Sequence, residues 1–103
     1  MAFKVLEMLF GSNKSKEDFT PINKGRYIVI GNRGNIVVGD LVVMAGNERI
    51  LSNASVIRRW GTTKGLGELA LDGKQSSTVL DYCGTFEFDM STTCGMIKVE
   101  SDL

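Results

Sequence analysis

The sequence contains no histidine, and this absence excludes the commonest forms of catalytic and metal chemistry. Without imidazole there is no Ser–His or Cys–His nucleophile pair, and the most frequent general base and metal ligand are missing. The two cysteines, Cys83 and Cys94, stand eleven positions apart, whereas a structural zinc site needs about four protein ligands. We therefore predict no metal and no cofactor. The thiols are interpreted as reduced, although facing positions across a hairpin would also allow them to meet.

Long apolar runs and net charge are also missing. No stretch approaches the roughly 20 apolar residues that cross a bilayer, and the run at 1–11 is interrupted by Lys4 and Glu7 and lacks the cleavage site of a signal peptide. Twelve basic and twelve acidic residues cancel, so no overall field attracts nucleic acid or a membrane. We expect a cytoplasmic protein without membrane contact. The charge balance weighs against nucleic-acid binding. Any anion would have to bind at a local cluster of basic residues.

The chain length predicts one small domain preceded by an arm. Residues 2–10 follow the pattern of an amphipathic helix, and a polar connector comes after it. A helix this short is not stable alone in water, so we expect it to dock on the β domain or on a neighbouring subunit. The predicted organisation is an N-terminal helix and connector arm at 1–24 and a small β domain at 25–103.

From residue 25 onward the pattern is mainly that of β-strands. Gly39-Asp40, inside an apolar run, indicates a bulge or sharp bend rather than two separate strands. The run that follows is expected to be one strand or a pair of strands, broken near Asn53. The expected strands are 26–31, 36–45, 49–60, 77–82, 85–90 and 95–100. A short helical insert is expected at about 64–71. Short strands joined by short turns favour a mainly β fold, a small antiparallel barrel or sandwich.

Several of the expected strands are apolar on both faces. The runs at 27–30, 36–38 and 41–44 do not alternate between apolar and polar residues. In one small barrel only one face of a strand points inward, so the other face needs a cover. The N-terminal helix, the helical insert or another subunit would supply it, and we favour a homo-oligomer.

The stretch from residue 58 to residue 65 concentrates the unusual chemistry of the chain. Alternation in a strand puts Arg58 and Trp60 on one face, at a spacing where a guanidinium stacks on an indole and is held ready for phosphate or carboxylate. The threonines and glycines that follow leave backbone N–H groups free ahead of a short helix, which favours an anion. The candidate ligand-binding residues are Arg58, Arg59, Trp60, Thr62, Thr63, Lys64 and Gly65.

Structural roles compete with an anion site at this stretch. The two arginines would instead pair with acidic side chains, the candidates being Glu48, Glu68, Glu87 and Asp89. Thr62 or Thr63 would cap the helix, with Glu68 too far along the chain to complete a capping box on Thr63. The run GLGELA at 65–70 fits a dinucleotide-binding pattern, but the parallel βαβ context is missing, so we reject that interpretation.

Catalytic residues are not predicted anywhere in the chain. The carboxylates near strands show no pairing by spacing, and Cys83 lacks a partner base. Tyr27 and Tyr82 are interpreted as core or interface aromatics. We therefore predict that the protein is not an enzyme.

The motifs YIVIGNRGNIVVGDL, VIRRWGTTKGLGELALDG, TVLDYCGTFEFDM and MIKVE carry a resemblance over about residues 25–100. Here the chain resembles a family of small phage- and prophage-encoded proteins catalogued only as a domain of unknown function. The resemblance implies a phage or prophage origin and no established activity. Gly61-Thr62 stand where the family has a second aromatic residue. The matching positions are Tyr27, Gly39, Leu41, Arg58, Trp60, Gly61, Leu66, Leu69, Ala70 and Gly73.

Two functions are predicted from these observations. The first is a non-catalytic, oligomeric binding protein in the host cytoplasm that sequesters an anionic, nucleotide-type defence signal or blocks a host defence protein. The alternative is a virion or assembly accessory, such as a decoration or tail protein, for which the N-terminal arm would hook a neighbour. A nucleic-acid binder of the small-barrel type is a third and weaker hypothesis.

Overall fold

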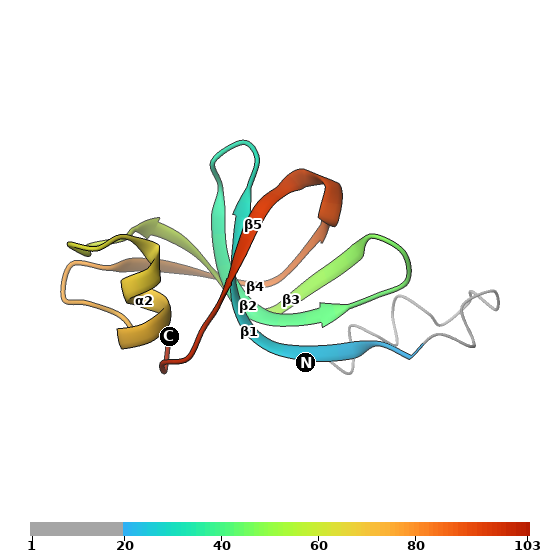
Figure 1. Ribbon diagram of the computed structural model, residues 1–103, viewed down its shortest axis with the longest axis horizontal. Helices are drawn as coiled ribbons and strands as arrows, with labels where there is room; N and C mark the ends of the chain where they lie inside the picture. The colour runs from blue at the N-terminus through green and yellow to red at the C-terminus, as the bar shows by residue number, and fades with distance from the viewer. Residues whose placement is uncertain (1–19) are drawn as a thin grey trace.

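The computed structural model describes residues 20–103, which form a five-stranded antiparallel sheet with one short helix (Figure 1). The strands lie in the order β4-β3-β2-β1-β5. The predicted N-terminal helix at residues 2–10 and most of the connector lie outside the described residues. In chain order the elements are β1 (Ile22–Gly31), β2 (Ile36–Val43), β3 (Glu48–Arg59), α2 (Leu66–Asp72), β4 (Val79–Asp89), the 3-10 turn η2 (Met90–Thr92) and β5 (Thr93–Lys98).

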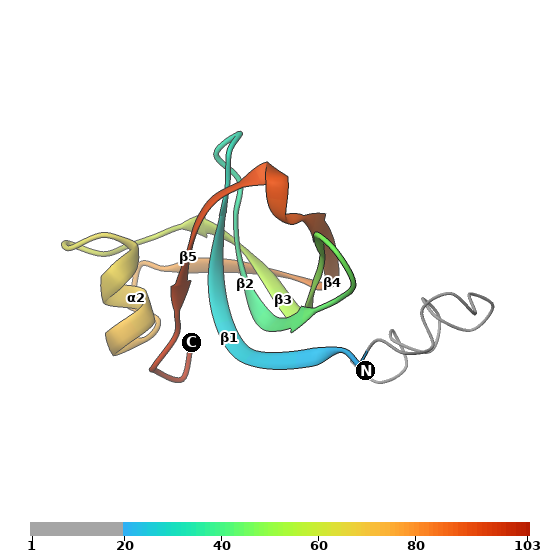
Figure 2. The same ribbon diagram turned by 45° about the vertical axis from the view of Figure 1, so that its right-hand side comes forward.

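The mainly β, antiparallel fold with a short helix is confirmed, but the sheet curls strongly and stays open, so it does not close into the predicted barrel. Turn η2 carries the chain from the β4 edge to the β5 edge, and α2 lies on the outside of the curve (Figures 1 and 2). Within residues 20–103 β5 pairs with β1 alone, and no ladder joins β5 to β4. The 3-10 turn takes the chain out of the β4 ladder at Asp89, where the carboxylate accepts a hydrogen bond from the backbone N–H of Ser91 at 2.8 Å.

One face of the sheet is covered by the helix and the C-terminal segment. Leu66, Leu69 and Ala70 of α2 pack with Val99 and Leu103 against sheet residues. The helix-side cluster consists of Ile28, Val38, Ile57, Leu66, Leu69, Ala70, Val99 and Leu103. Two hydrogen bonds hold the C-terminal segment beside α2: the Glu100 N–H donates to the Ala70 carbonyl, and the Ser101 hydroxyl donates to the Leu69 carbonyl.

The opposite face of the sheet is concave, and side chains of the edge strands β4 and β5 cover it because the sheet curls. The concave-side cluster consists of Val29, Val37, Leu41, Leu51 and Ala54, with Phe86 and Phe88 of β4 and Met96 of β5 among the half-buried side chains around it. The two clusters explain why the central strands are apolar on both faces. Each face has a cover within the chain, and the predicted homo-oligomer stays a prediction.

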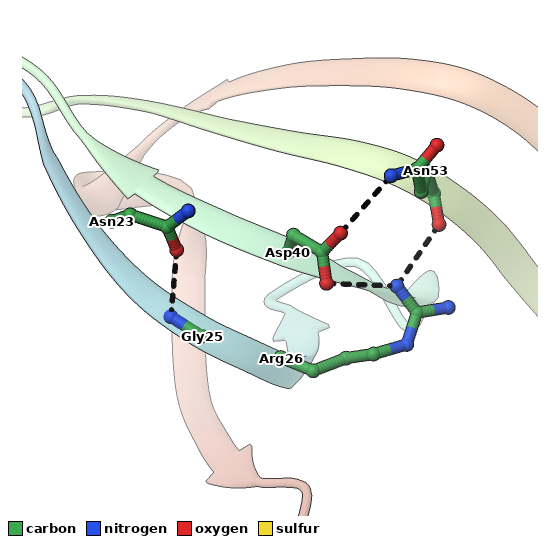
Figure 3. A network of polar contacts seen from close by, with 5 residues as sticks. All are labelled: Asn23, Gly25, Arg26, Asp40 and Asn53. Atoms are coloured by element: carbon green, nitrogen blue, oxygen red, sulfur yellow. Dashed lines mark hydrogen bonds and ion pairs between the residues drawn. The ribbon is translucent and has the colours of Figure 1, made fainter. Parts of the chain in front are cut away.

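A polar network fixes the bend in β2 and β3 (Figure 3). The pairing register of these strands shifts between Val38 and Asp40, which confirms the bulge predicted at Gly39-Asp40. The Arg26 guanidinium donates to the Asp40 carboxylate at 3.2 Å and to the Asn53 carbonyl at 3.1 Å, and the Asn53 side chain donates to Asp40 at 3.1 Å. Asn53 has φ 48°, a left-handed conformation that Asn tolerates. Of the two alternatives predicted for this run, β3 is one strand, and its register with β4 is irregular around Asn53.

Candidate functional site

The predicted ligand-binding stretch lies where β3 ends and the chain turns into α2. Arg58 is paired: its Nε lies 2.6 Å from a carboxylate oxygen of Asp81 on β4. Both side chains are largely exposed, at 68% and 50%, so solvent screens this pair and its contribution to stability is small. The cation–π contact described in residues 20–103 joins Lys98 to Tyr27, and the predicted stacking of Arg58 on Trp60 is absent from this part of the chain.

Two of the backbone donors at the predicted anion site are occupied by Glu68. Its carboxylate oxygen Oε1 accepts hydrogen bonds from the Thr63 N–H at 3.2 Å, the Thr63 hydroxyl at 3.3 Å and the Lys64 N–H at 3.0 Å. Glu68 reaches Thr63 because the loop folds back over the start of α2, but no capping box forms on Thr63, as predicted, since Gly65 is the residue that precedes the helix. The residue that precedes the helix is Gly65, and the Thr62 hydroxyl donates to the Gly65 carbonyl, so neither threonine caps the helix.

Three predicted ligand residues keep accessible groups at this corner. The Trp60 side chain is 43% exposed, while its carbonyl accepts a hydrogen bond from the buried Thr78 hydroxyl at 2.7 Å. Arg59 and Lys64 are exposed, and within residues 20–103 neither side-chain cation has an ion pair or a hydrogen bond. Among residues 20–103 the corner therefore offers two exposed cations without a partner, while Glu68 already binds the backbone N–H groups of Thr63 and Lys64.

Removing the Glu68 side chain is expected to destabilise the corner. Glu68→Ala leaves the Thr63 and Lys64 donors without their carboxylate, and we expect the free energy of unfolding to fall by about 1–2 kcal/mol. Chemical denaturation measures the change. Glu100→Ala removes an exposed carboxylate and serves as the control, for which a change within about 0.5 kcal/mol is expected. Equal effects for the two variants would contradict this role of Glu68.

A cavity of about 290 Å³ opens elsewhere, at one end of the concave face. We call it the mouth pocket. Its floor is apolar and belongs to the concave-side cluster: Val29, Val37, Phe86 and Phe88. Its rim is polar and comes from the β1–β2 turn and from the chain around η2: Asn32, Arg33, Asn35, Thr92 and Thr93, with Gly31 between floor and rim. The backbone N–H of Asn32 donates to the Thr92 carbonyl at 2.8 Å and ties the two sides of the rim together.

The rim of the mouth pocket has unused polar groups. Within residues 20–103 the Arg33 guanidinium and the side-chain amides of Asn32 and Asn35 have no hydrogen-bond or ion-pair partner. Arg33 is the one charged residue among the lining residues that the structure describes. The backbone hydrogen bond that caps η2 stabilises the ionised carboxylate and lowers the pKa of Asp89, but Asp89 does not line this cavity.

A second hollow, of about 250 Å³, lies where β3 begins and β4 ends. Glu48, Glu87 and Asp89 line it together with one cation, Arg49. The Arg49 guanidinium already donates to the carbonyls of Gly46 and Glu48, at 2.9 and 2.8 Å. The excess of carboxylates makes this hollow a poor site for an anion.

The two cysteines lie on different edges of the sheet. Cys83 lies on β4 and Cys94 on β5, the two opposite edge strands, and both are exposed free thiols. The hairpin pairing considered for them is therefore not formed. Among residues 20–103 no group of three or more side chains is arranged to hold a metal ion, and no helix there is long and apolar enough to cross a membrane.

Comparison with known proteins gives no match: no family model, no curated protein and no solved structure matches the chain. The resemblance to phage-encoded proteins stays a prediction.

Proposed function

We propose that the protein is a non-catalytic binding protein that sequesters a small anionic molecule of the nucleotide type. The observation that supports this is the mouth pocket, in which an apolar floor meets one arginine without a partner in residues 20–103. Small-molecule sites combine such an apolar lining with few polar groups that fix orientation. Binding without conversion fits a cavity whose lining, among residues 20–103, has no carboxylate, thiol or lysine to act as base or nucleophile.

The ligand site in this proposal is the mouth pocket and not the predicted corner at residues 58–65. At the corner Glu68 supplies the anion that the backbone donors bind, and Asp81 pairs with Arg58. At the rim of the mouth pocket Arg33 has no competing carboxylate among the lining residues. An incoming phosphate or carboxylate would form a charge-assisted, bidentate contact with its guanidinium.

We extend the proposal to the role of the bound molecule, a defence signal, and to the place of action, the host cytoplasm. A protein that holds a nucleotide-type signal lowers the free concentration of that signal in the host cytoplasm, which is the action expected of a phage-encoded inhibitor of host defence. Homo-oligomerisation belongs to the same proposal and is supported by exposed aromatic side chains such as Trp60 and Tyr82, which are typical of interfaces. The virion-accessory alternative depends on the N-terminal arm, most of which lies outside the described residues.

Substitution of Arg33 tests the binding site. Calorimetric titration with adenosine 5′-monophosphate, ribose 5-phosphate and benzoate is expected to show that at least one binds, and that Arg33→Gln weakens that binding about tenfold or more, because a charge-assisted hydrogen bond contributes about 1.5–3 kcal/mol. Arg33 lies in an exposed turn, so the variant is expected to stay folded. Arg59→Gln tests the corner: if it abolishes binding while Arg33→Gln does not, the assignment to the mouth pocket is wrong.

A further inference from the structure

The size of the mouth pocket limits what it can hold. Its volume of about 290 Å³ lies at the lower end of the roughly 300–1,000 Å³ that is usual for small-molecule sites. One ring system fits such a space, whereas the two bases of a dinucleotide do not. A second ring or a long chain would remain in solvent.

The floor favours a flat ring. Phe86 and Phe88 lie along the same face of β4, with their ring centroids 5.9 Å apart and their planes tilted by 33°. Both are half-buried, so each keeps part of its ring open to the concave side, and Val29 and Val37 complete the floor. A planar aromatic ligand gains offset or edge-to-face contacts with such rings in addition to buried apolar area. An aliphatic ligand of the same size gains the area alone.

The rim favours one anionic group and a polar ring edge. Arg33 is the one cation among the residues of the described range, 20–103, that line the cavity, so a second charged group on the ligand would find no second cation among them. The side-chain amides of Asn32 and Asn35 each offer a donor and an acceptor, and neither is used within residues 20–103. Heteroatoms on the edge of a ring match such amides, whereas a hydrocarbon edge does not.

We propose that the mouth pocket binds a planar heteroaromatic ring that carries one anionic group, with the ring on Phe86 and Phe88 and the anion on Arg33. The proposal rests on the proposed function and narrows its ligand. The anionic group on the ring is a phosphate or a carboxylate. One set of probes tests each of these two groups.

Two sets of probes dissect the ligand into its parts by calorimetric titration of the full chain. The phosphate set is adenosine 5′-monophosphate, adenosine and ribose 5-phosphate, and the carboxylate set is indole-3-acetate, indole and acetate. In at least one set we expect the joined ring and anion to bind about tenfold or more tightly than either part. We expect Phe88→Leu to weaken the ring-containing probes more than the ring-free ones, and Arg33→Gln to weaken only the charged probes. Thermal unfolding confirms that both variants are folded.

The outcomes separate this inference from the proposed function. If ribose 5-phosphate or acetate binds as tightly as its ring-bearing counterpart and Arg33→Gln weakens it, the anion-binding function stands and the heteroaromatic ligand is wrong. If adenosine or indole binds as tightly as the charged probe, and Arg33→Gln changes nothing, the anionic part of both proposals is wrong. If no probe of either set binds, the inference is overturned.

Discussion

Replacing Leu69 by alanine is expected to lower the free energy of unfolding by about 2–5 kcal/mol. Leu69 is fully buried in the helix-side cluster, where α2 meets the sheet and the C-terminal segment. Its backbone carbonyl also accepts the Gly73 N–H at the end of α2 and the Ser101 hydroxyl. Truncation leaves a cavity at the point that joins these elements, and a chain of this size has only about 5–15 kcal/mol in total. Denaturant unfolding measures the change.

The control for this prediction lies two residues away on the same helix. Leu71 is 63% exposed, so Leu71→Ala removes the same atoms from solvent-facing helix and is expected to change the stability by less than about 0.5 kcal/mol. Similar losses for the two variants would mean that α2 does not pack on the sheet through the Leu69 side of the helix.

Alanine at Gly61 is expected to destabilise the protein by about 2–5 kcal/mol through two separable effects. Gly61 has φ 67°, and a side chain in that conformation costs about 1–2 kcal/mol. A Cβ there would also overlap the backbone of Ser77 and lie 2.5 Å from the Thr78 nitrogen, and such overpacking costs about 1–3 kcal/mol. The loop after β3 would have to separate from the loop before β4.

Gly46 supplies a matched control for the Gly61 prediction. Its φ of 61° is nearly the same, and a Cβ built on it meets no atom within 4 Å. Gly46→Ala therefore reports the conformational cost alone, and its difference from Gly61→Ala in thermal or chemical unfolding reports the steric cost. Equal losses would show that the two loops do not approach as closely as the structure places them.

Local signals in the sequence predict much of the sheet. The bulge at Gly39-Asp40 and the short helix before Gly73 are both present, because each depends on neighbouring residues. The runs predicted at 77–82 and 85–90 are instead one strand, β4. Gly84 lies between them with φ 83°, which lets the strand bend without ending. Sequence composition alone does not distinguish such a bend from a turn.

The curvature of the sheet and the register of its strands cannot be predicted from such local signals. The partner of Arg58 is Asp81, which was not among the predicted acids, because the pairing of β3 with β4 decides which carboxylate lies opposite. The mouth pocket was missed for the same reason: its floor and rim come from residues near 29–37 and near 86–93, which meet only when the sheet curls. Arg33, in the glycine- and asparagine-rich run at 31–35, is the one signal for this site that the sequence offers.

The most direct test is a map of amide chemical shifts in a ¹⁵N-labelled sample titrated with adenosine 5′-monophosphate and, separately, with indole-3-acetate. The proposed site predicts that the largest shifts fall at residues 31–35 and at Thr92 and Thr93, around the mouth pocket. Shifts concentrated at residues 62–65 would place the anion at the corner instead. Shifts at neither place, with probe concentrations in the millimolar range, would contradict the account of this protein as an anion-binding protein.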